Sequence, residues 1–349
     1  MLFKIVPSLP FLFSYPSKKV ILGFCRININ YGKPIAEKEE GRELLQRMVN
    51  APYFLLVIAA LFWGGNAVAG KFLAGSLPPV TISFTRLAIG VLIMSPVIIK
   101  LFMHERAAFR EHFRLLLFLA VTGVIGFNLL IYWAVNYTTA INATLLNSTS
   151  PLFIFLLSAL LIGEKMELRY WVSMVISMLG VLVVITHGSF ERMLSLHFNI
   201  GDLIMVLAVI SWALYSIFIK KISGKIPSLA IFGFTLTIGF LLMIPAVGIE
   251  LFMVPVGNVG LEEWSALFYI GIFPSICSFL LWNRGVELIG PSKASISLNL
   301  IPVFGTVFAF FVLGEVISLP QILGGCLVFA GVAITSFTKK KTVQLAEEA

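Results

Sequence analysis

The sequence is poor in charged side chains, and this scarcity excludes most soluble folds. Only 12% of its 349 residues are Asp, Glu, Lys or Arg, whereas about a quarter of a soluble globular domain is charged. Hydrophobic residues make up 59% of the chain, and its mean hydropathy is +0.99. The chain is therefore expected to be an integral membrane protein.

Groups that usually carry catalysis or bind metals are scarce too. Cys25, Cys277 and Cys326 form no spacing motif, so neither a disulfide framework nor a metal site is predicted. An enzyme that works inside a membrane needs a metal set, paired aspartates or an activated nucleophile. The sequence has no H-E-x-x-H motif, and no predicted span has Asp or Glu at its centre. We predict that the protein is not an enzyme and needs no cofactor, and proton coupling receives no support.

What the sequence does have is a series of long apolar runs. Ten of them reach the length of about 20 residues that a helix needs to cross a bilayer. They cover residues 52–73, 79–102, 114–135, 139–162, 168–187, 201–220, 227–248, 263–284, 291–313 and 318–337. None alternates polar and apolar residues over about ten positions, as a barrel strand would. The predicted fold class is an all-α membrane protein with ten transmembrane helices.

The basic residues indicate the orientation of these helices. With the N-terminus in the cytoplasm, 22 of the 25 Lys and Arg residues fall in cytoplasmic segments. Arg192 lies in an outer loop, and Lys71 and Arg86 lie inside predicted helices. Because basic loops stay on the cytoplasmic side, both termini of this multi-pass protein of the cell membrane are predicted to be cytoplasmic. The net charge of +8 then reflects topology and not binding to nucleic acid.

Residues 1–50 differ in character from the rest of the chain. Pro7, Pro10 and Pro16 interrupt their apolar residues, and no signal-peptide cleavage site is evident. We expect a cytoplasmic extension that is disordered or lies on the membrane surface. Alternatively, Met48 is the true start, because the pattern of spans begins directly after it.

The membrane-spanning part of the sequence is present twice. A shift of 149 residues places residues 61–96 over residues 210–245 without a gap and gives eleven identities in 36 positions. Composition alone would give about three or four. The identities of this block include Trp63/Trp212, Lys71/Lys220, Gly75/Gly224 and Pro78/Pro227. A shift of 151 residues relates a later block, with Pro151/Pro302, Phe153/Phe304, Gly163/Gly314 and Glu164/Glu315.

This duplication predicts how the chain is divided. Each copy holds five spans, and an odd number makes the second copy enter the membrane from the opposite side. Inverted repeats of this kind underlie many carriers. We predict an N-terminal extension (1–50), a first repeat (51–187), an outer linker (188–199), a second repeat (200–338) and a cytoplasmic tail (339–349).

Small polar residues recur on one face of the fourth span and on one face of the ninth. Thr144, Ser148 and Pro151 share a face in the fourth span. Their counterparts are Ser295, Asn299 and Pro302. Because polar groups inside a membrane turn toward protein or water, the two stripes are expected to face each other. Each proline also frees a backbone carbonyl, at Asn147 in the fourth span, as a possible substrate contact. The alternative is that these residues only join helices.

Aromatic and amide side chains complete the predicted site. Trp63 and Asn66 in the first span correspond to Trp212 and Tyr215 in the sixth, and large flat side chains with a polar edge suit organic solutes. Packing alone is the alternative for them. The candidate substrate-binding residues are Trp63, Asn66, Asn128, Tyr132, Thr144, Asn147, Ser148, Trp212, Tyr215, Ser278, Trp282, Ser295 and Asn299.

Charged residues within or beside the spans form a second set of candidates. Arg86 lies seven residues into the second span, where a charge is costly unless it is paired or hydrated. Its counterpart is Thr235, so the fold does not require this charge. Anion binding or gating is one role for Arg86, and extension of its side chain to the interface is the other. The further charge or gating candidates are Lys71, Glu164, Lys220 and Glu315, for which a structural role is the alternative.

These features together resemble the EamA-type carriers of the drug/metabolite transporter superfamily. They are ten spans in two matched halves, Trp63 and Trp212 early in each half, and Pro-x-Phe followed by Gly-Glu in each fourth span. The resemblance covers about residues 51–338. It implies an all-α carrier with a central cavity between the halves, usually in a bacterial cytoplasmic membrane.

The leading hypothesis is a secondary transporter that moves a small organic metabolite. The resemblance implies export or exchange of an amino-acid-like or drug-like solute by alternating access, with the bilayer and the solute as the partners. A channel or a membrane receptor that transports nothing is the alternative function.

Overall fold

The computed structural model describes residues 51–336 except 74, 135, 136, 139, 195–198, 255, 256, 258 and 315. The side chains of residues 67, 71, 132, 140–142, 145, 192, 193 and 313 are also outside the described part. The predicted extension (1–50), the predicted tail (339–349) and Glu315 therefore lie outside the described residues.

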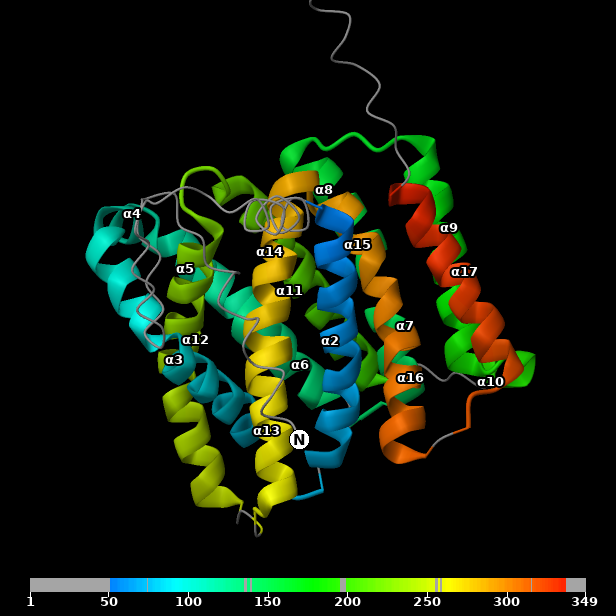
Figure 1. Cartoon of the computed structure of the whole chain (residues 1–349), viewed down its shortest axis with the longest axis horizontal. Helices are drawn as coiled ribbons and strands as arrows, with labels where there is room; N and C mark the ends of the chain where they lie inside the picture. Colours follow the sequence, from blue (N-terminus) through cyan, green and yellow to red (C-terminus); the bar gives the residue numbers. More distant parts are fainter. Residues whose placement is uncertain are drawn as a thin grey trace, which may run out of the picture. The chain divides into compact units, whose positions relative to one another are not determined.

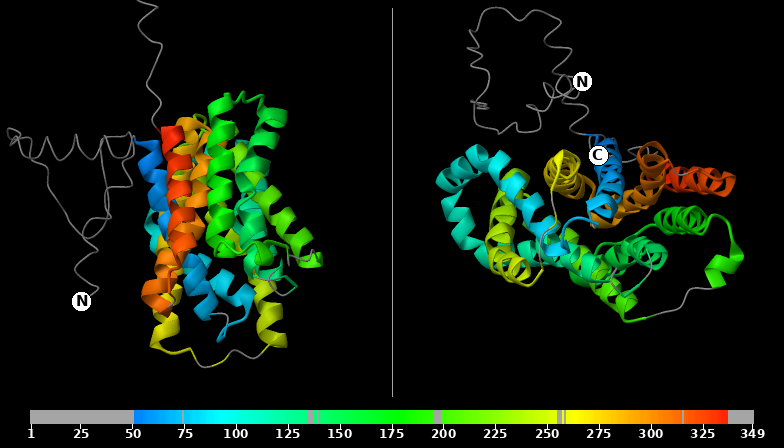
Figure 2. Two further views of the ribbon diagram at one scale, coloured as in Figure 1. Left: turned by 90° about the vertical axis from the view of Figure 1, so that its right-hand side faces the viewer. Right: turned by 90° about the horizontal axis from the view of Figure 1, so that it is seen from below.

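The described part of the chain is helical, with no strand among its named elements. Its helices run alongside one another (Figures 1 and 2). They are α2 (Pro52–Leu73), α3 (Pro79–His104), α4 (Arg106–Glu111), α5 (Phe113–Leu119), α6 (Phe127–Ala134), α7 (Ala140–Asn147), α8 (Ser150–Ile162), α9 (Leu168–Thr186) and α10 (Phe190–Leu194). After them come α11 (Ile200–Ile222), α12 (Ser228–Met253), α13 (Leu261–Ile272), α14 (Ser278–Ile289), α15 (Pro291–Ser295), α16 (Leu300–Leu313) and α17 (Leu319–Ser336).

Length and composition make this a multi-pass membrane protein. Among the described residues, eight helical segments are long and apolar enough to cross a bilayer. Two further apolar helices, Ser150–Ile162 and Leu319–Thr335, are shorter and lie within the predicted spans 139–162 and 318–337. Many large apolar side chains point outward; Leu160 is 79% exposed and Phe311 77%. Such a surface is unfavourable in water and is suited to lipid.

The third and eighth predicted spans are each interrupted by a π-helical segment at a related position. The first segment, η3 (Ala120–Gly126), joins α5 to α6, and the second, η4 (Phe273–Cys277), joins α13 to α14. A π-helical turn releases carbonyls from the normal helix pattern, and in a membrane these must find other donors. Ser211 of α11 donates to the carbonyl of Thr122 at 2.8 Å, and Trp63 of α2 donates to that of Pro274 at 3.2 Å.

The fourth and ninth predicted spans are broken as well. α7 and α8 are separated by a turn directly before Ser150, and α15 and α16 are separated by the 3-10 segment η5 (Ile296–Asn299). Proline is tolerated in the first turn of a helix because its missing N–H has no partner there. Pro151 occupies that position in α8, so the break falls before the proline. α8 and α16 then end in the same way, with Gly163 at φ 66° and Gly314 at φ 68°.

α9 and α17 pack side by side through small residues (Figure 1, green and red). A Cβ atom built on Gly180 would lie 2.7 Å from the carbonyl oxygen of Gly324 and 2.7 Å from the nitrogen of Val328. The Ser173 hydroxyl donates a short hydrogen bond to the Gly331 carbonyl. Small residues let membrane helices approach closely enough for backbone contact. Close van der Waals packing therefore stabilises the α9–α17 pair.

α12 is longer than the sequence predicted. The apolar run predicted a span over 227–248, yet the helix continues to Met253 and includes Glu250. The carboxylate of Glu250 accepts hydrogen bonds from Val80 N at 3.0 Å, Thr81 N at 2.6 Å and Thr81 Oγ1 at 2.7 Å. These groups form the first turn of α3, whose amides lack partners within their own helix. A negative charge is favoured at this helix end, which accounts for a glutamate within the extended helix.

Candidate solute-binding cavity

A cavity of about 1020 Å³ lies among the helices. Ligand pockets in proteins usually measure about 300–1,000 Å³, so a small organic molecule fits it. The cavity reaches the end of the bundle where α2 gives way to α3, since residues 75–79 and Val254 line it there. Deeper in the bundle it is lined by Trp63, Trp212 and Phe279.

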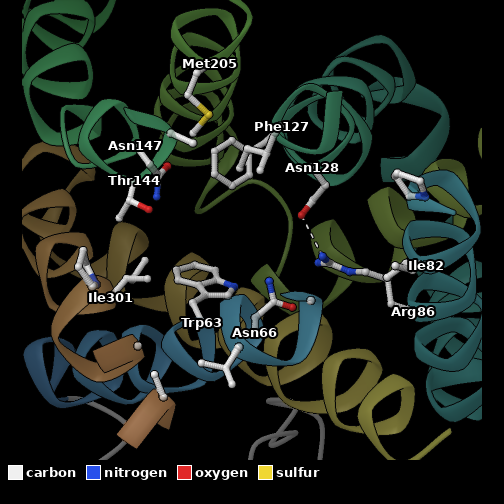
Figure 3. A pocket seen from close by; sticks show the side chains of 18 of the residues that line it. Trp63, Asn66, Ile82, Arg86, Phe127, Asn128, Thr144, Asn147, Met205 and Ile301 are labelled. Atoms are coloured by element: carbon white, nitrogen blue, oxygen red, sulfur yellow. Dashed lines mark hydrogen bonds between the residues drawn. The ribbon is translucent and has the colours of Figure 1, made fainter. Parts of the chain in front are cut away.

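Polar side chains occupy two sides of the cavity (Figure 3). Arg86 of α3 and Asn128 of α6 lie on one side, and Thr144 and Asn147 of α7 lie on the other. Trp63 and Asn66 project from α2 into the space between these sides. Phe127, Met205 and Ile301 supply apolar surface. The lining thus combines an apolar surface with a few fixed polar groups, as is typical of sites for organic ligands.

Arg86 is buried, with 3% of its surface exposed. Its Nε donates to Ser275 Oγ at 2.9 Å, and its Nη1 donates to Asn128 Oδ1 at 2.9 Å. The guanidinium therefore does not extend to the bilayer surface, which was one sequence-based alternative. Both of its partners are neutral.

An aromatic layer, formed by Trp63, Trp212, Tyr215, Phe279 and Trp282, closes the deep end of the cavity. The ring centroids of Trp63 and Trp212 are 5.4 Å apart with nearly perpendicular planes, and those of Trp212 and Tyr215 are 5.2 Å apart and stacked. Tyr215 and Trp282 are fully buried. Edge-to-face and offset pairs at these distances are the favourable arrangements of aromatic rings, so the layer is a well-packed barrier.

One hydrogen bond fixes the buried side of the aromatic layer. Tyr215 Oη donates to Asn283 Oδ1 at 3.0 Å, and Asn283 is fully buried. This bond joins α11 to α14. The layer is therefore held by a polar contact as well as by ring packing.

Seven of the residues predicted from the sequence line the cavity together. They are Trp63, Asn66, Arg86, Asn128, Thr144, Asn147 and Trp212. The carbonyl of Asn147, which Pro151 is expected to free from its helix bond, accepts a hydrogen bond from Ser150 Oγ at 2.5 Å. The Asn147 side chain lies at the cavity (Figure 3) and is a group that this position offers to a ligand.

Six predicted binding residues lie away from the cavity lining. Tyr215 and Trp282 belong to the aromatic layer. Ser148 Oγ donates to Thr144 O at 2.8 Å, Ser278 Oγ to Ala59 O at 3.1 Å, Ser295 Oγ to Ser292 O at 2.7 Å and Asn299 Nδ2 to Ser177 Oγ at 2.7 Å. These bonds stabilise helices or join them, as the alternative interpretation of the polar stripes anticipates. The side chains of Tyr132 and Lys71, and all of Glu315, lie outside the described residues.

Glu164 and Lys220 line a second, smaller cavity of about 510 Å³, together with Arg169, Tyr170 and Lys293. Glu164 Oε2 accepts a hydrogen bond from Ser292 Oγ at 2.7 Å. Lys220 Nζ donates to the carbonyl of Glu287 at 2.7 Å. Both residues therefore hold together segments of the chain that are far apart in sequence.

Some lining residues had no signal in the sequence. Phe127, Phe279, Met205 and Ile301 are apolar, and nothing distinguishes them from the many apolar residues that face lipid. Glu250 lies beyond the predicted end of its span, and only the packing of α12 against α3 brings it to the cavity.

Long apolar helices around an internal cavity with polar groups are the architecture of a multi-pass membrane transporter. The chain belongs to the EamA-like transporter family, which it matches over residues 50–186 and 199–337. It is therefore a membrane transporter by family.

Related proteins bear names that agree with this assignment and specify no solute. The chain is 28% identical over 284 residues to the uncharacterized transporter YyaM of Bacillus subtilis, covering 81% of this chain and 93% of YyaM. It is 27% identical to the uncharacterized transporter YetK of the same organism, covering 87% of this chain and 92% of YetK. A solved crystal structure superimposes with a TM-score of 0.64 at 21% identity, covering 81% of this chain and 95% of the other, which shows a shared fold.

Proposed function

We propose that the protein carries a small organic solute across the cell membrane by alternating access. The observation that carries this proposal is a solute-sized cavity that reaches one end of the bundle and stops at the aromatic layer. A carrier exposes its site to one side at a time, whereas a channel needs a continuous path. An amino-acid-like or drug-like metabolite, exported or exchanged, is the proposed cargo class.

The proposed arrangement is two inverted repeats of five spans, at residues 51–187 and 200–338, joined by the linker 188–199. The recurrence of π-helical segments at η3 and η4 supports it, as does the shared φ of Gly163 and Gly314. Related helices also pack in matched pairs: α2 against α14, α11 against α6, and α3 against α12. Two equivalent packings of such repeats give two states that open to opposite sides.

The side to which the cavity opens follows from the basic residues. With both termini in the cytoplasm, as the distribution of Lys and Arg favours, the end at residues 75–79 is the outer one. The cavity then opens outward, and the aromatic layer with its Tyr215–Asn283 bond closes the inner side. A C-terminal reporter that is active only in the cytoplasm tests this orientation; activity only on the outside would contradict it.

Two glycines give a matched test of the cavity. Gly70 lines it, Gly248 does not, and a Cβ built on either meets no atom of the described residues within 4 Å. Neither substitution by Trp should strain the helix, so Gly70→Trp should abolish solute flux while Gly248→Trp preserves it. The assay is countertransport in proteoliposomes, with an amino-acid and metabolite panel as solutes. Equal flux in both variants would show that the solute does not pass through this cavity. Flux that does not saturate with solute concentration would favour a channel.

A further inference from the structure

The charge of Arg86 is not needed to build the fold. The counterpart of Arg86 in the second copy is Thr235, which is fully buried. Its hydroxyl donates to carbonyls of its own helix, Ile231 at 2.9 Å and Phe232 at 3.0 Å. A neutral side chain therefore fills the equivalent position with its polar group satisfied.

The two partners of Arg86 are held in the orientation that accepts its protons. Ser275 Oγ donates its own hydrogen to the Ile270 carbonyl at 2.6 Å, which leaves a lone pair for Arg86 Nε. Asn128 donates through Nδ2 to the Val124 carbonyl at 3.0 Å, so its oxygen faces Arg86 Nη1. These bonds position the guanidinium but leave its positive charge unmatched.

The carboxylate that shares the cavity with Arg86 is already engaged. Glu250 accepts three hydrogen bonds from the first turn of α3, at Val80 and Thr81. Thr81 precedes Arg86 by five residues, about 7.5 Å along the helix axis. No Asp or Glu oxygen in the described part of the chain lies within 4 Å of the Arg86 guanidinium. An unmatched buried charge is costly, and such groups in membrane proteins mark solute or ion sites.

Free hydrogen-bond donors face the cavity beside this charge. Arg86 Nη2 has no hydrogen-bond partner in the described part of the chain. It is also not among the polar atoms that are buried without a partner. The amide of Asn66 projects into the same space, one turn after Trp63 on α2 (Figure 3). Asn66 Nδ2 likewise has no hydrogen-bond partner in the described part of the chain, and it is not among the buried polar atoms without a partner. Asn66 Oδ1 is buried and has no partner. Arg86 and Asn66 therefore both offer donors to the cavity.

We propose that Arg86 binds the carboxylate of the transported solute, with Asn66 as a second donor and with the apolar body of the solute against Trp63 and Phe127. This inference rests on the proposed function. A guanidinium presents paired N–H groups that match a carboxylate. Because one unmatched cation faces the cavity among the described lining residues, the substrate class is organic monocarboxylates.

Three probes that share one apolar body test this inference. They are 3-phenylpropanoate, 3-phenylpropanamide and 3-phenylpropylamine, which carry a negative charge, no charge and a positive charge. Binding to the purified full-length protein is followed by tryptophan fluorescence, which Trp63 should report, and by thermal stabilisation. The carboxylate should bind at least about tenfold more tightly than the amide, and the amine most weakly.

The variants separate a binding role from a structural one. Arg86→Gln should reduce the preference for the carboxylate over the amide to within about twofold, whereas Arg86→Lys should retain part of it. Arg110→Gln is the control, since it makes the same change on the exposed surface of α4 and should leave the preference intact. Thermal unfolding without ligand shows whether each variant is folded. If Arg86→Gln does not fold, the reduced preference of Arg86→Lys still tests the inference.

Three outcomes overturn the inference, and none depends on the proposed function. The first is equal or tighter binding of the amide, and the second is no binding of the carboxylate at millimolar concentration. The third is an unchanged preference in folded Arg86→Gln. If the unmodified protein carries a solute and Gly70→Trp abolishes that flux, the proposed transport function holds although the carboxylate inference fails. Conversely, charge-selective binding that Arg86 controls, without flux of any solute, would leave the binding site standing and refute transport.

Discussion

The carboxylate of Glu250 should stabilise the protein by capping a helix other than its own. Glu250→Gln keeps the shape of the side chain and one acceptor oxygen but removes the charge. A hydrogen bond to a charged group contributes about 1.5–3 kcal/mol and a neutral one about 0.5–1.5, a difference of about 1 kcal/mol per bond. Two backbone N–H groups of α3, those of Val80 and Thr81, donate to this carboxylate.

The interaction of the charge with the helix end adds about 0.3–1 kcal/mol. Because Glu250 is only half-buried, water screens part of the effect, and we expect Glu250→Gln to lower the free energy of unfolding by about 2 kcal/mol. The assay is reversible unfolding in mixed micelles, followed by tryptophan fluorescence.

The matched control is Glu262→Gln, since Glu262 is exposed in the first turn of α13. This substitution should cost no more than about 0.5 kcal/mol. Equal stability of the two variants would refute the capping argument, and it would leave the extension of α12 to Met253 without its physical reason.

Three further substitutions test packing and backbone geometry by the same unfolding measurement. Tyr215→Phe should cost about 1 kcal/mol, because it removes the donor to Asn283 and both residues are fully buried; unchanged stability would mean that this bond contributes nothing. Gly163→Ala should cost about 1 kcal/mol from its positive φ alone, since no atom of the described part of the chain lies within 4 Å of the added methyl group, and a much larger loss would indicate an unrecognised contact. Gly180→Leu should cost about 3 kcal/mol or prevent folding by separating α9 from α17, and a fully stable variant would show that this contact is not tight.

The spans were predictable because the bilayer imposes one length and one polarity on every helix that crosses it. The predicted boundaries therefore follow the observed helices closely for α2, α3 and α9. They fail where a charge has a partner in the folded chain. α12 continues through Glu250, which is bound by the first turn of α3, and α14 continues past Arg284, whose Nη1 lies 3.1 Å from Oε2 of Glu287 in the same helix. A hydropathy analysis places the end of a span at such a charge because it has no information on the partners that satisfy it.

The site was only partly predictable, because periodicity shows which residues share a face and not what that face meets. Thr144 lies on the predicted polar face of the fourth span and lines the cavity. Asn299, on the corresponding face of the ninth span, meets Ser177 of α9 instead. Both are small polar residues in an apolar helix, and their sequence surroundings do not distinguish a ligand contact from a helix contact.

The comparison of the two copies suggests a rule for where specificity is encoded. Positions that keep the same residue form the frame: Trp63 and Trp212 contact each other at the base of the cavity. Positions that differ supply polar groups of the proposed site. Asn66 offers a donor to the cavity, whereas its counterpart Tyr215 is sealed in the aromatic layer. Arg86 has a charge where its counterpart has a hydroxyl. If the two halves exchange conformations during transport, the two members of such a pair exchange their environments. The solute then contacts different side chains in the state open to the outside and in the state open to the inside. Under the proposed function, we expect affinity for the solute to differ between the two open states and Arg86 to set the side of tighter binding.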